Sequence, residues 1–395
     1  MSRRESIARA GGVLLIDVGG SGGVSDYTGE LARALSAIGW RVQLATARDH
    51  GFELPPEIAV HRVYAYVRGR RPAARLARRI GLARIVNGIA HLVGNALAAR
   101  IARSCEIVHV QGEEWPPLGA ALMLMLRAAR RPMIYTMHNT FERGAHSYER
   151  TNNLIRRGAA AMIVHSENDL RSLPASQAAK TSVIPHGEYG RVATRSGPAP
   201  DRGACREQLG VGERELLALM FGQLRPDKGL SDLLRAAIDL PGLRIVAAGE
   251  DHGAVEEVAG LREDPRLRDR VSVMPGFVAD ETAARLFAAC DLVALPYHRA
   301  SASGVLLLAY GHARPVVIYP IGGLPEYVRA GETGWICARA DPGALTEELR
   351  AIAAEGRAEC ARRGELAAHF AQEQLGWGAI ARATASTYER TRRLA

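Results

Sequence analysis

Cysteine, aromatic residues and long apolar runs are all scarce in this 395-residue sequence. The cysteines are odd in number and no pair has the spacing of a metal or redox site; they are Cys105, Cys205, Cys290, Cys337 and Cys360. This pattern favours reduced thiols in a cytoplasmic compartment and argues against a bound metal. Aromatic residues are only 5% of the chain, and no segment resembles an RNA- or DNA-binding module, so we expect no nucleic-acid partner.

The apolar runs are too short to cross a membrane. The longest, Pro116 to Leu126, is well below the length that a bilayer requires. Near the N-terminus, Val13 to Val18 follows Arg3 and Arg4 but leads into glycines, which is typical of a strand and not of a signal peptide. We therefore expect neither a secretion signal nor a spanning segment.

Acidic residues are absent between Glu57 and Glu106, a window that holds ten arginines in a chain of net charge +9. Apolar residues from Leu76 to Leu97 recur there at roughly helical spacing. A basic amphipathic helix can lie on an anionic membrane or hold a phosphorylated substrate, and it can equally be a solvated helical face. The arginines assigned to an acceptor or membrane are Arg70, Arg71, Arg75, Arg78 and Arg79.

The first half alternates short apolar runs with helical patterns, which predicts a doubly wound α/β domain with a parallel sheet. Its first strand ends in a turn with four glycines, Gly19 to Gly23, and a helix follows. Ligands of such sheets bind beyond the carboxyl ends of the strands. The glycine spacing matches no standard phosphate-binding motif, however, and a tight turn without a ligand would need glycines too.

His138 directly follows another expected strand, Met133 to Met137. It therefore lies at the edge of the sheet where a ligand would bind. An isolated histidine is also a common structural residue, so its position leaves both interpretations open.

The length of the chain and a polar segment rich in Gly, Pro, Ser and Arg indicate two domains. We place the first domain at residues 1–188, a linker at 189–202 and the second domain at 203–373. The second domain repeats the alternation of strand and helix, beginning with the strand Leu216 to Phe221. Two doubly wound, Rossmann-like domains that face each other would leave a central cleft, a usual place for a ligand.

The turn after that strand carries Arg225 and Lys228, close to the expected start of a helix near Ser231. Backbone N–H groups and the helix dipole favour negative charge at such a point, and two fixed cations suit a phosphate or diphosphate. A solvated turn without a ligand is the competing interpretation.

Two further segments follow strands of the second half. The residues Ser303, Gly304 and Val305 open a helix, so their N–H groups could bind a phosphate. Glu326 follows two glycines in a turn, where it either caps the next short helix or accepts hydrogen bonds from sugar hydroxyls.

Together these segments resemble the retaining glycosyltransferases of family four, which have the GT-B fold. The resemblance covers nearly the full length and rests on several motifs in the expected order: GGSGGVSDYTGELARAL, His138-Asn139, VIPHG, FGQLRPDKGLSDLLRA, GFVADETAARLFAACDLVALPY and SGVLLLAYGHARPVVIYPIGGLPEYV. It also implies that a C-terminal helix, residues 374–395, crosses back onto the first domain.

The resemblance implies roles for individual residues. Arg225 and Lys228 match the pair that holds the diphosphate of a nucleotide-sugar donor, and His138 matches a residue near the donor sugar. Gly22 and Gly23 match the turn beside the donor phosphate and the acceptor. Contacts to the base or to the phosphates are implied for Phe277, Val278, Ser303, Gly304 and Val305. Because side chains supply the cations, we expect no metal and no cofactor besides the substrate.

One departure from the family concerns its common Glu-x7-Glu pair. Ala300 and Leu308 occupy these two positions, so both carboxylates are missing. The surrounding residues are intact, and the segment looks like that of a subgroup that replaces the pair. Glu326 is the nearest remaining carboxylate.

The function implied is transfer of a sugar from a nucleotide diphosphate donor to a glycan or lipid-linked acceptor, with retention of anomeric configuration, as in polysaccharide biosynthesis. Such an enzyme would act in the cytoplasm, peripherally on the inner face of the cell membrane. The alternatives are a non-catalytic relative that binds a nucleotide sugar, and a GT-B-fold sugar-nucleotide epimerase.

Overall fold

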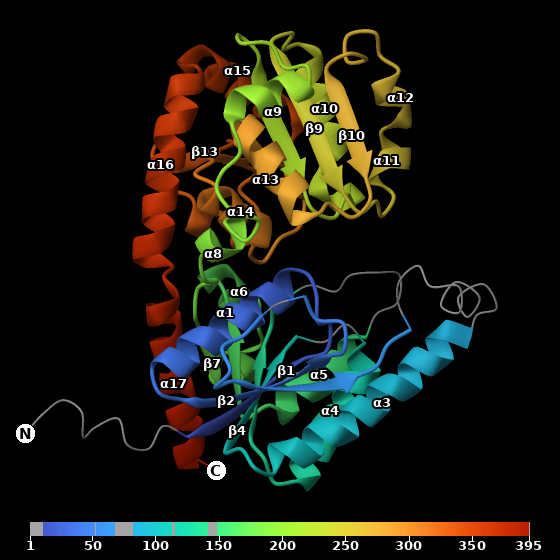
Figure 1. The fold of residues 1–395 in the computed structure, drawn as a ribbon, viewed down its shortest axis with the longest axis vertical. Coiled ribbons are helices and arrows are strands. Elements are labelled where there is room, and N and C mark those ends of the chain that lie inside the picture. Colours follow the sequence, from blue (N-terminus) through green and yellow to red (C-terminus); the bar gives the residue numbers. More distant parts are fainter. Residues whose placement is uncertain (1–10, 52, 68–81, 113–114, 141–147, 395) are drawn as a thin grey trace, which may run out of the picture. The chain divides into compact units, whose positions relative to one another are not determined.

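A computed structural model describes residues 11–51, 53–67, 82–112, 115–140 and 148–394 of the chain (Figure 1). These residues form two compact units. The first contains the chain up to His186 together with the helix that begins at Trp377, and the second is Gly187–Gly376. Each unit has its own parallel sheet and its own apolar core.

The sheet of the first unit has seven parallel strands in the order β3-β2-β1-β4-β5-β6-β7. They are β1 Gly12–Asp17, β2 Arg41–Ala47, β3 Ala59–Tyr64, β4 Ile107–Gln111, β5 Met133–Thr136, β6 Ala161–Val164 and β7 Thr181–Val183. The central strand β1 is buried along its whole length, which explains its unbroken apolar run. The strand order reverses between β1 and β4, where doubly wound sheets bind their ligands.

Seven helices are described in the first unit: α1 Gly23–Ala37, α3 Leu82–Ala102, α4 Pro116–Ala128, α5 Glu149–Gly158, α6 Glu167–Arg171, α7 Ala175–Ala178 and α17 Trp377–Leu394. The C-terminal helix α17 packs beside α1. Its Tyr388 is fully buried and meets the ring of Trp40 edge-on, with 5.0 Å between the ring centroids. The last helix of the chain therefore completes the core of the first unit.

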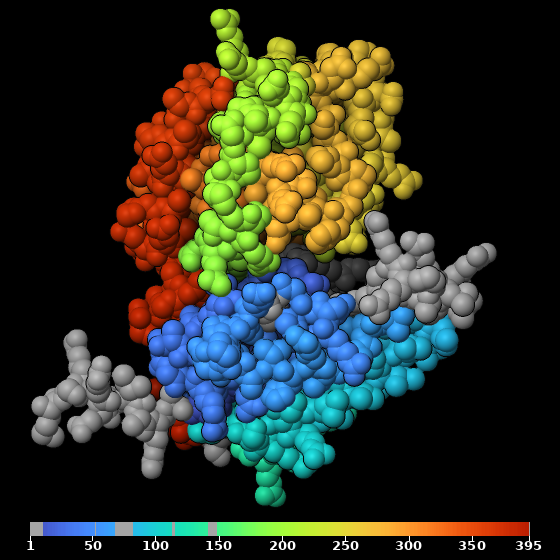
Figure 2. Space-filling model, viewed as in Figure 1, coloured from blue at the N-terminus to red at the C-terminus, as the bar shows by residue number. Residues whose placement is uncertain are grey.

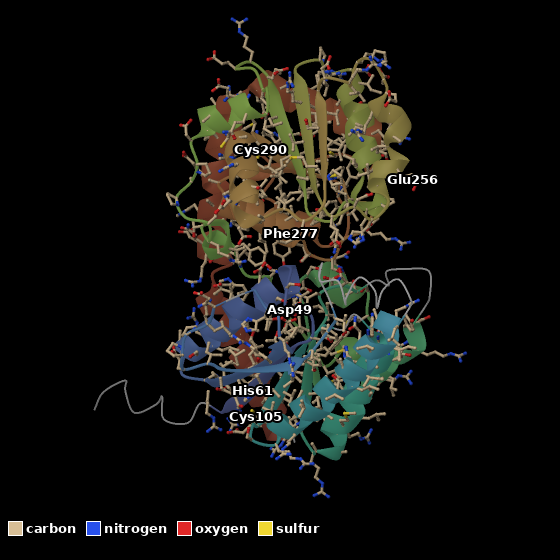
Figure 3. The ribbon with its side chains drawn as sticks, turned by 45° about the vertical axis from the view of Figure 1, so that its right-hand side comes forward. Asp49, His61, Cys105, Glu256, Phe277 and Cys290 are labelled. Carbon is tan, nitrogen blue, oxygen red and sulfur yellow. The ribbon has the colours of Figure 1, made fainter. Side chains whose placement is uncertain are left out.

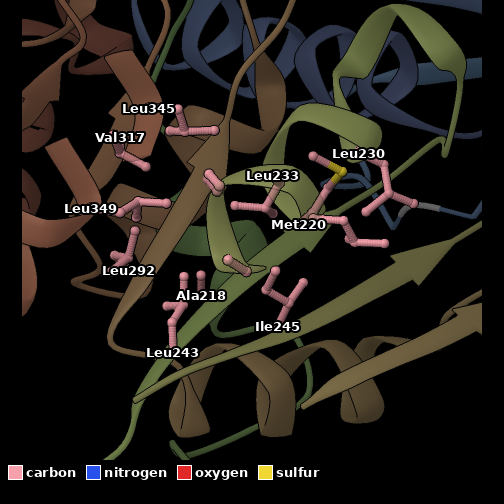
Figure 4. Packing of buried hydrophobic residues seen from close by; sticks show 14 of the residues in the cluster. Ala218, Met220, Leu230, Leu233, Leu243, Ile245, Leu292, Val317, Leu345 and Leu349 are labelled. Atoms are coloured by element: carbon pink, nitrogen blue, oxygen red, sulfur yellow. The ribbon is translucent and has the colours of Figure 1, made fainter. Parts of the chain in front are cut away.

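The sheet of the second unit has six parallel strands in the order β10-β9-β8-β11-β12-β13. They are β8 Leu216–Phe221, β9 Leu243–Gly249, β10 Val271–Pro275, β11 Leu292–Leu295, β12 Val316–Ile318 and β13 Gly334–Ile336. Figure 4 shows the apolar core over this sheet, where Leu233, Val317 and Leu349 lie among the buried side chains. The order reverses between β8 and β11, as it does between β1 and β4 in the first unit.

The helices of the second unit are α8 Gly190–Ala193, α9 Arg202–Gln208, the 3-10 turn η2 Pro226–Lys228, α10 Leu230–Ile238, α11 Ala254–Glu257, α12 Ala259–Arg262, α13 Asp280–Ala289, α14 Gly304–Gly311, the 3-10 turn η3 Leu324–Tyr327, α15 Pro342–Glu355 and α16 Arg357–Gln374. A buried carboxylate, Asp291, ties α9 to α16. Arg202, Arg206 and Arg357 lie 2.5, 3.0 and 3.1 Å from it. Three cations around one buried anion satisfy its need for charge and hydrogen bonds.

The predicted fold class, two doubly wound α/β domains, is confirmed. The segment 189–202, expected to be a linker, belongs to the second unit and includes α8. Its Tyr189 is buried, and the Tyr189 ring would lie 3.3 Å from a Cβ placed on Gly304 of α14. All five cysteines are buried free thiols; Figure 3 labels Cys105 and Cys290.

Candidate functional site

In the second unit, residues Gly222–Gly229 form a turn between β8 and α10 that we call the cationic turn. Its backbone is fixed on both sides. Leu224 N donates to the carbonyl of Glu250 at 2.8 Å, and His298 N donates to the carbonyl of Asp227 at 2.9 Å. These partners follow β9 and β11, the two strands that flank β8. The turn is therefore held at the point where the strand order reverses.

Two glycines allow this close approach of backbones. Gly229 has φ +73°, and a Cβ placed there would lie 2.1 Å from the carbonyl oxygen of Pro296. Gly249, at the end of β9, has φ +149°, and its Cβ would lie 1.6 Å from the carbonyl oxygen of Gly222. No side chain fits at either position, so both glycines are required by geometry.

Both cations of the turn have partners within the unit. The Arg225 guanidinium forms a bidentate pair with Asp227, with Nε and Nη2 at 2.8 and 2.7 Å from the two carboxylate oxygens. The Lys228 Nζ lies 3.4 Å from the centroid of the Tyr297 ring, a cation–π contact. With one anion and two cations, the turn carries a net charge of +1. A bound diphosphate would compete with Asp227 for the guanidinium.

The N-terminus of α14 lies beside the cationic turn. The Val305 Cγ2 would be 3.2 Å from a Cβ placed on Gly222. Ser303 caps the helix, since its Oγ accepts a hydrogen bond from Leu306 N at 3.3 Å. The structure thus brings the predicted phosphate-binding residues of two distant segments, the cationic turn and Ser303–Val305, to one edge of the sheet.

Phe277 is 92% exposed and lies in the loop after β10, at the same edge of the sheet (Figure 3). This loop is tied to β9, because Gly276 N donates to the carbonyl of Gly249 at 2.8 Å. Val278, next in the chain, is half-buried. A bare aromatic ring at this edge is a surface on which a flat heterocycle can stack.

Glu326 is exposed and belongs to η3. Its loop packs on the segment that leads into α14: Gly323 N donates to the carbonyl of Ser301 at 3.1 Å. Gly322 comes even closer, because its Cβ would lie 1.7 Å from the carbonyl oxygen of Ala300. The surviving carboxylate is therefore on a loop that touches the position of one missing glutamate.

An acidic group that the sequence analysis missed lies behind the cationic turn. Asp232 on α10 is 4% exposed and accepts a hydrogen bond from the Tyr319 hydroxyl at 2.9 Å. The His298 Nε2 lies 3.2 Å from the same oxygen, and the Arg235 Nη1 lies 3.6 Å from the other. Burial and the charge of Asp232 raise the pKa of Tyr319 well above its usual value, so the phenol keeps its proton. His298 follows the end of β11. The sequence analysis selected His138 because it follows a strand of a parallel sheet, and the same criterion would have selected His298.

In the first unit, a buried carboxylate organises the glycine turn. Asp17, the last residue of β1, accepts hydrogen bonds from Gly19 N at 3.1 Å and from Gly20 N at 3.3 Å. The Ser25 hydroxyl of α1 donates to it at 2.6 Å. Gly22 caps α1 with φ +80°, and Gly23 is the first residue of this helix. The loop is shaped by its own carboxylate, and its last glycines lie at the helix N-terminus.

Three histidines surround one tyrosine in the same unit, and we call His138, His165 and His186 the histidine cluster. They follow β5, β6 and β7 respectively, so they lie side by side at the carboxyl edge of the sheet. The Tyr27 ring lies 4.9, 5.1 and 4.9 Å from their ring centroids. Tyr27 belongs to α1, so the cluster adjoins the helix that starts at Gly23.

Hydrogen bonds fix the tautomer of His138. His165 Nδ1 lies 3.0 Å from the carbonyl oxygen of Ile184, so it carries the proton. His165 Nε2 then accepts from His138 Nδ1 at 3.2 Å, which leaves the lone pair of His138 on Nε2. That nitrogen lies 3.2 Å from Gln111 Oε1, whereas the Gln111 Nε2 faces the His109 ring at 3.2 Å, so this tautomer requires the amide rotated by 180° from that orientation. Burial lowers the pKa of both histidines, most strongly that of His138, so both rings are neutral at pH 7.

His109, in contrast to His138, has a purely structural role. It is fully buried in β4, with Nδ1 2.6 Å from the Tyr388 hydroxyl and Nε2 2.6 Å from Thr136 Oγ1. Burial lowers the pKa of His109 to about 3. Both nitrogens are used inside the core, so His109 serves the fold.

The predicted acceptor and membrane arginines, Arg70, Arg71, Arg75, Arg78 and Arg79, lie outside the described residues. Within the described ranges, no group of three or more His, Cys, Asp or Glu side chains is placed to hold a metal ion.

Comparisons of sequence match both halves of the chain. Residues 21–187 match a family described as "Glycosyltransferase Family 4", and residues 215–355 match "Glycosyl transferases group 1". A D-inositol 3-phosphate glycosyltransferase of Mycobacterium sp. (strain KMS) is 34% identical over 41% of this chain, and the match spans only 38% of that relative. An enzyme of the same name from Streptomyces avermitilis is 29% identical over 94% of this chain and 83% of its own length.

Comparisons of structure extend over nearly the full chain. Sucrose-phosphate synthase from Thermosynechococcus elongatus has a TM-score of 0.75 at 21% identity and covers 98% of this chain and 100% of its own. Anabaena HepE in complex with UDP-glucose has a TM-score of 0.71 at 21% identity, and the match covers 96% of this chain and 100% of HepE. At these identities the likeness establishes the fold, and it agrees with the expected pair of Rossmann-like domains.

Proposed function

We propose that this chain, whose residues 21–187 and 215–355 match two glycosyltransferase family models, is a family 4 enzyme that transfers a sugar from a nucleoside diphosphate sugar to an acceptor with retention of configuration. The observation that carries the proposal is the cationic turn beside the N-terminus of α14, at the reversal point of the second sheet. Helix N-terminal N–H groups and fixed cations are what a leaving diphosphate requires.

In this proposal the second unit binds the donor. Lys228 and Arg225 stabilise the negative charge that develops on the diphosphate as the bond to the sugar breaks. The N–H groups of Gly304 and Val305 contact the same phosphates, and the base stacks near Phe277 and Val278. Glu326 accepts hydrogen bonds from hydroxyls of the donor, a role that the missing Glu-x7-Glu pair leaves open. No metal or other cofactor takes part.

The first unit contributes His138 and the turn at Gly22 and Gly23. The His138 Nε2 would exchange its contact with Gln111 for a hydrogen bond from a sugar hydroxyl, because His165 already takes up Nδ1. We further propose that the departing diphosphate accepts the proton of the attacking hydroxyl. Attack on the face from which the diphosphate leaves retains the anomeric configuration.

The donor and acceptor are proposed from the neighbours and relatives. The HepE complexes contain UDP and UDP-glucose, which makes uridine nucleotide sugars the first donors to test. The name of the sequence relatives favours an inositol phosphate as acceptor. A glycan or lipid-linked intermediate on the inner face of the cell membrane is the second candidate, because the arginines between Glu57 and Glu106 suit an anionic acceptor.

Release of nucleotide from the purified full-length chain tests the proposal. UDP-glucose is incubated with D-inositol 3-phosphate, with a lipid-linked sugar diphosphate, or with no acceptor, and free UDP is measured alongside the anomeric proton of the product. A transferase releases UDP well above background only with an acceptor and forms the same anomer as the donor. Acceptor-independent conversion to another UDP-sugar would identify an epimerase, and tight binding of every donor tried without turnover would identify a non-catalytic binder.

A further inference from the structure

Helix α3 has an unusual surface for a helix of a doubly wound α/β unit. Among the described residues it is the one helix that is long and apolar enough to cross a membrane. Six large apolar side chains on it are 40–62% exposed: Leu82, Ile85, Ile89, Leu92, Val93 and Leu97. Figure 2 shows α3, in cyan, at the surface of its unit.

These side chains form one continuous stripe. At 100° per residue, positions 82 to 97 with this spacing fall within an arc of about 140° and extend for about 22 Å along the helix. Leu124 of the adjacent helix α4 is 55% exposed, and Trp115, which precedes α4, is 40% exposed. Contiguous exposed apolar surface of this kind marks a binding face.

The opposite face of α3 is locked into the unit. Asn95 is fully buried, accepts from the Tyr64 hydroxyl at 3.1 Å and donates to the carbonyl of Leu118 at 2.9 Å. The His91 Nδ1 lies 2.9 Å from the Tyr66 hydroxyl. Gly94 permits the contact, because a Cβ there would lie 2.2 Å from the Tyr64 ring. Spanning a bilayer would strip these polar groups of their partners in hydrocarbon, so α3 cannot be a transmembrane helix.

The charges near the stripe favour one class of partner. Helices α3 and α4 contain three arginines, Arg84, Arg100 and Arg127, and no acidic residue, although Glu113 and Glu114 precede Trp115 in the sequence. A bilayer with anionic headgroups offers an apolar interior to the stripe and negative charge to its cations. Trp115 adds the aromatic side chain that prefers the boundary between headgroups and acyl chains.

We propose that the apolar stripe of α3, with Trp115 and Leu124, is a docking face that inserts into the surface of an anionic lipid bilayer while α3 stays folded in the first unit. The proposal is independent of the glycosyl transfer proposed above, and its test uses no substrate. It places the main contact on apolar side chains of α3, whereas the sequence-based expectation assigned it to Arg70, Arg71, Arg75, Arg78 and Arg79.

Co-sedimentation of the full-length chain with lipid vesicles tests this. One set of vesicles is phosphatidylcholine alone, and the other contains one third phosphatidylglycerol. The stripe variant carries Ile85→Gln, Ile89→Gln and Val93→Gln. A matched control carries Leu154→Gln, Met274→Gln and Leu366→Gln, which replace apolar residues that are 36–46% exposed elsewhere. Thermal unfolding of each variant shows whether it remains folded.

We expect at least tenfold stronger partitioning onto the anionic vesicles than onto the neutral ones. The stripe variant should lose at least tenfold of that partitioning, whereas the control should stay within twofold of the parent. Equal binding by the stripe variant would show that the arginines suffice and would overturn the proposal. So would resistance to alkaline extraction, which indicates spanning, or a dimer that the stripe variant disrupts without any vesicle binding.

Discussion

Replacing Lys228 by Met removes one charge from the cationic turn and leaves most of its packing intact. The Lys228 side chain is half-buried over Tyr297. Methionine is unbranched, of similar length, and makes favourable sulfur–aromatic contacts. The loss of the cation–π contact should therefore lower the free energy of unfolding by only about 1 kcal/mol.

The expected effect on catalysis is much larger. A charge-assisted hydrogen bond is worth about 1.5–3 kcal/mol, and a pair of unit charges 4 Å apart near a protein surface attracts by about 4 kcal/mol. If about 3 kcal/mol of this acts on the leaving diphosphate, kcat/KM falls about 150-fold. The turn has a net charge of only +1. Loss of the Lys228 charge therefore leaves the turn with no net positive charge, because Asp227 neutralises Arg225.

The assay compares kcat/KM for acceptor-dependent UDP release with the free energy of unfolding in urea. Arg244→Met is the matched control, since it also removes one cation from the second unit. Arg244 lies at the amino end of β9, where its Nε is 2.7 Å from Glu215 Oε2. The reasoning is refuted if Lys228→Met keeps kcat/KM within threefold of the parent, or if Arg244→Met loses as much.

Three other perturbations probe separate features. Gly229→Ala must adopt φ +73° with its Cβ 2.1 Å from a carbonyl oxygen, so we expect urea denaturation to show a free energy of unfolding lower by about 3 kcal/mol. The control Gly253→Ala, with φ +101° and open space around its Cβ, should lose only about 1–2 kcal/mol through backbone strain. Equal losses in the two variants would contradict the packing argument. His165→Phe leaves His138 without a fixed tautomer, so kcat/KM should fall about tenfold while the Kd for UDP stays within twofold of the parent. Unchanged kcat/KM would show that His165 does not position His138. The pKa of His109 is about 3 in the folded chain and 6.5 in the unfolded chain. The unfolded chain therefore binds more protons between these two values, and the free energy of unfolding decreases as the pH is lowered. At pH 5 this group alone should cost about 2 kcal/mol relative to pH 7, and equal urea midpoints at both values would disprove it.

The strands that sequence patterns predict best are those with both faces buried. Leu216–Phe221 was predicted with the bounds that the structure has, because central parallel strands are unbroken apolar runs. The edge strand β3 was missed, since its sequence AVHRVY mixes polar residues and it is half-exposed. A three-residue strand such as β13, Gly334–Ile336, offers too short a pattern to detect.

The candidate site residues follow from a single rule, that ligands bind at the carboxyl edge of a parallel sheet. The rule located His138, and it would have located His165 and His186 had it been applied to β6 and β7. It could not show that His165 fixes the tautomer of His138, because that depends on the distance between two side chains 27 residues apart. Nor could it show the pairing of Arg225 with Asp227, which depends on the conformation of the turn between them.

The cationic turn owes less to its cations than its sequence suggests. Asp227 cancels one of its two charges, and the carboxylates that would assist at the positions of Ala300 and Leu308 are missing. What remains specific is the backbone, held at the sheet edge by approaches that only glycine permits, at Gly229 and Gly249. The turn amides of Leu224, Lys228 and Gly229 already donate to backbone carbonyls. An anion at this edge would therefore be met by Lys228, the main source of net charge, and by the N–H groups at the start of α14. Two glycines that carry no chemical group of their own are therefore positions where a methyl group does not fit.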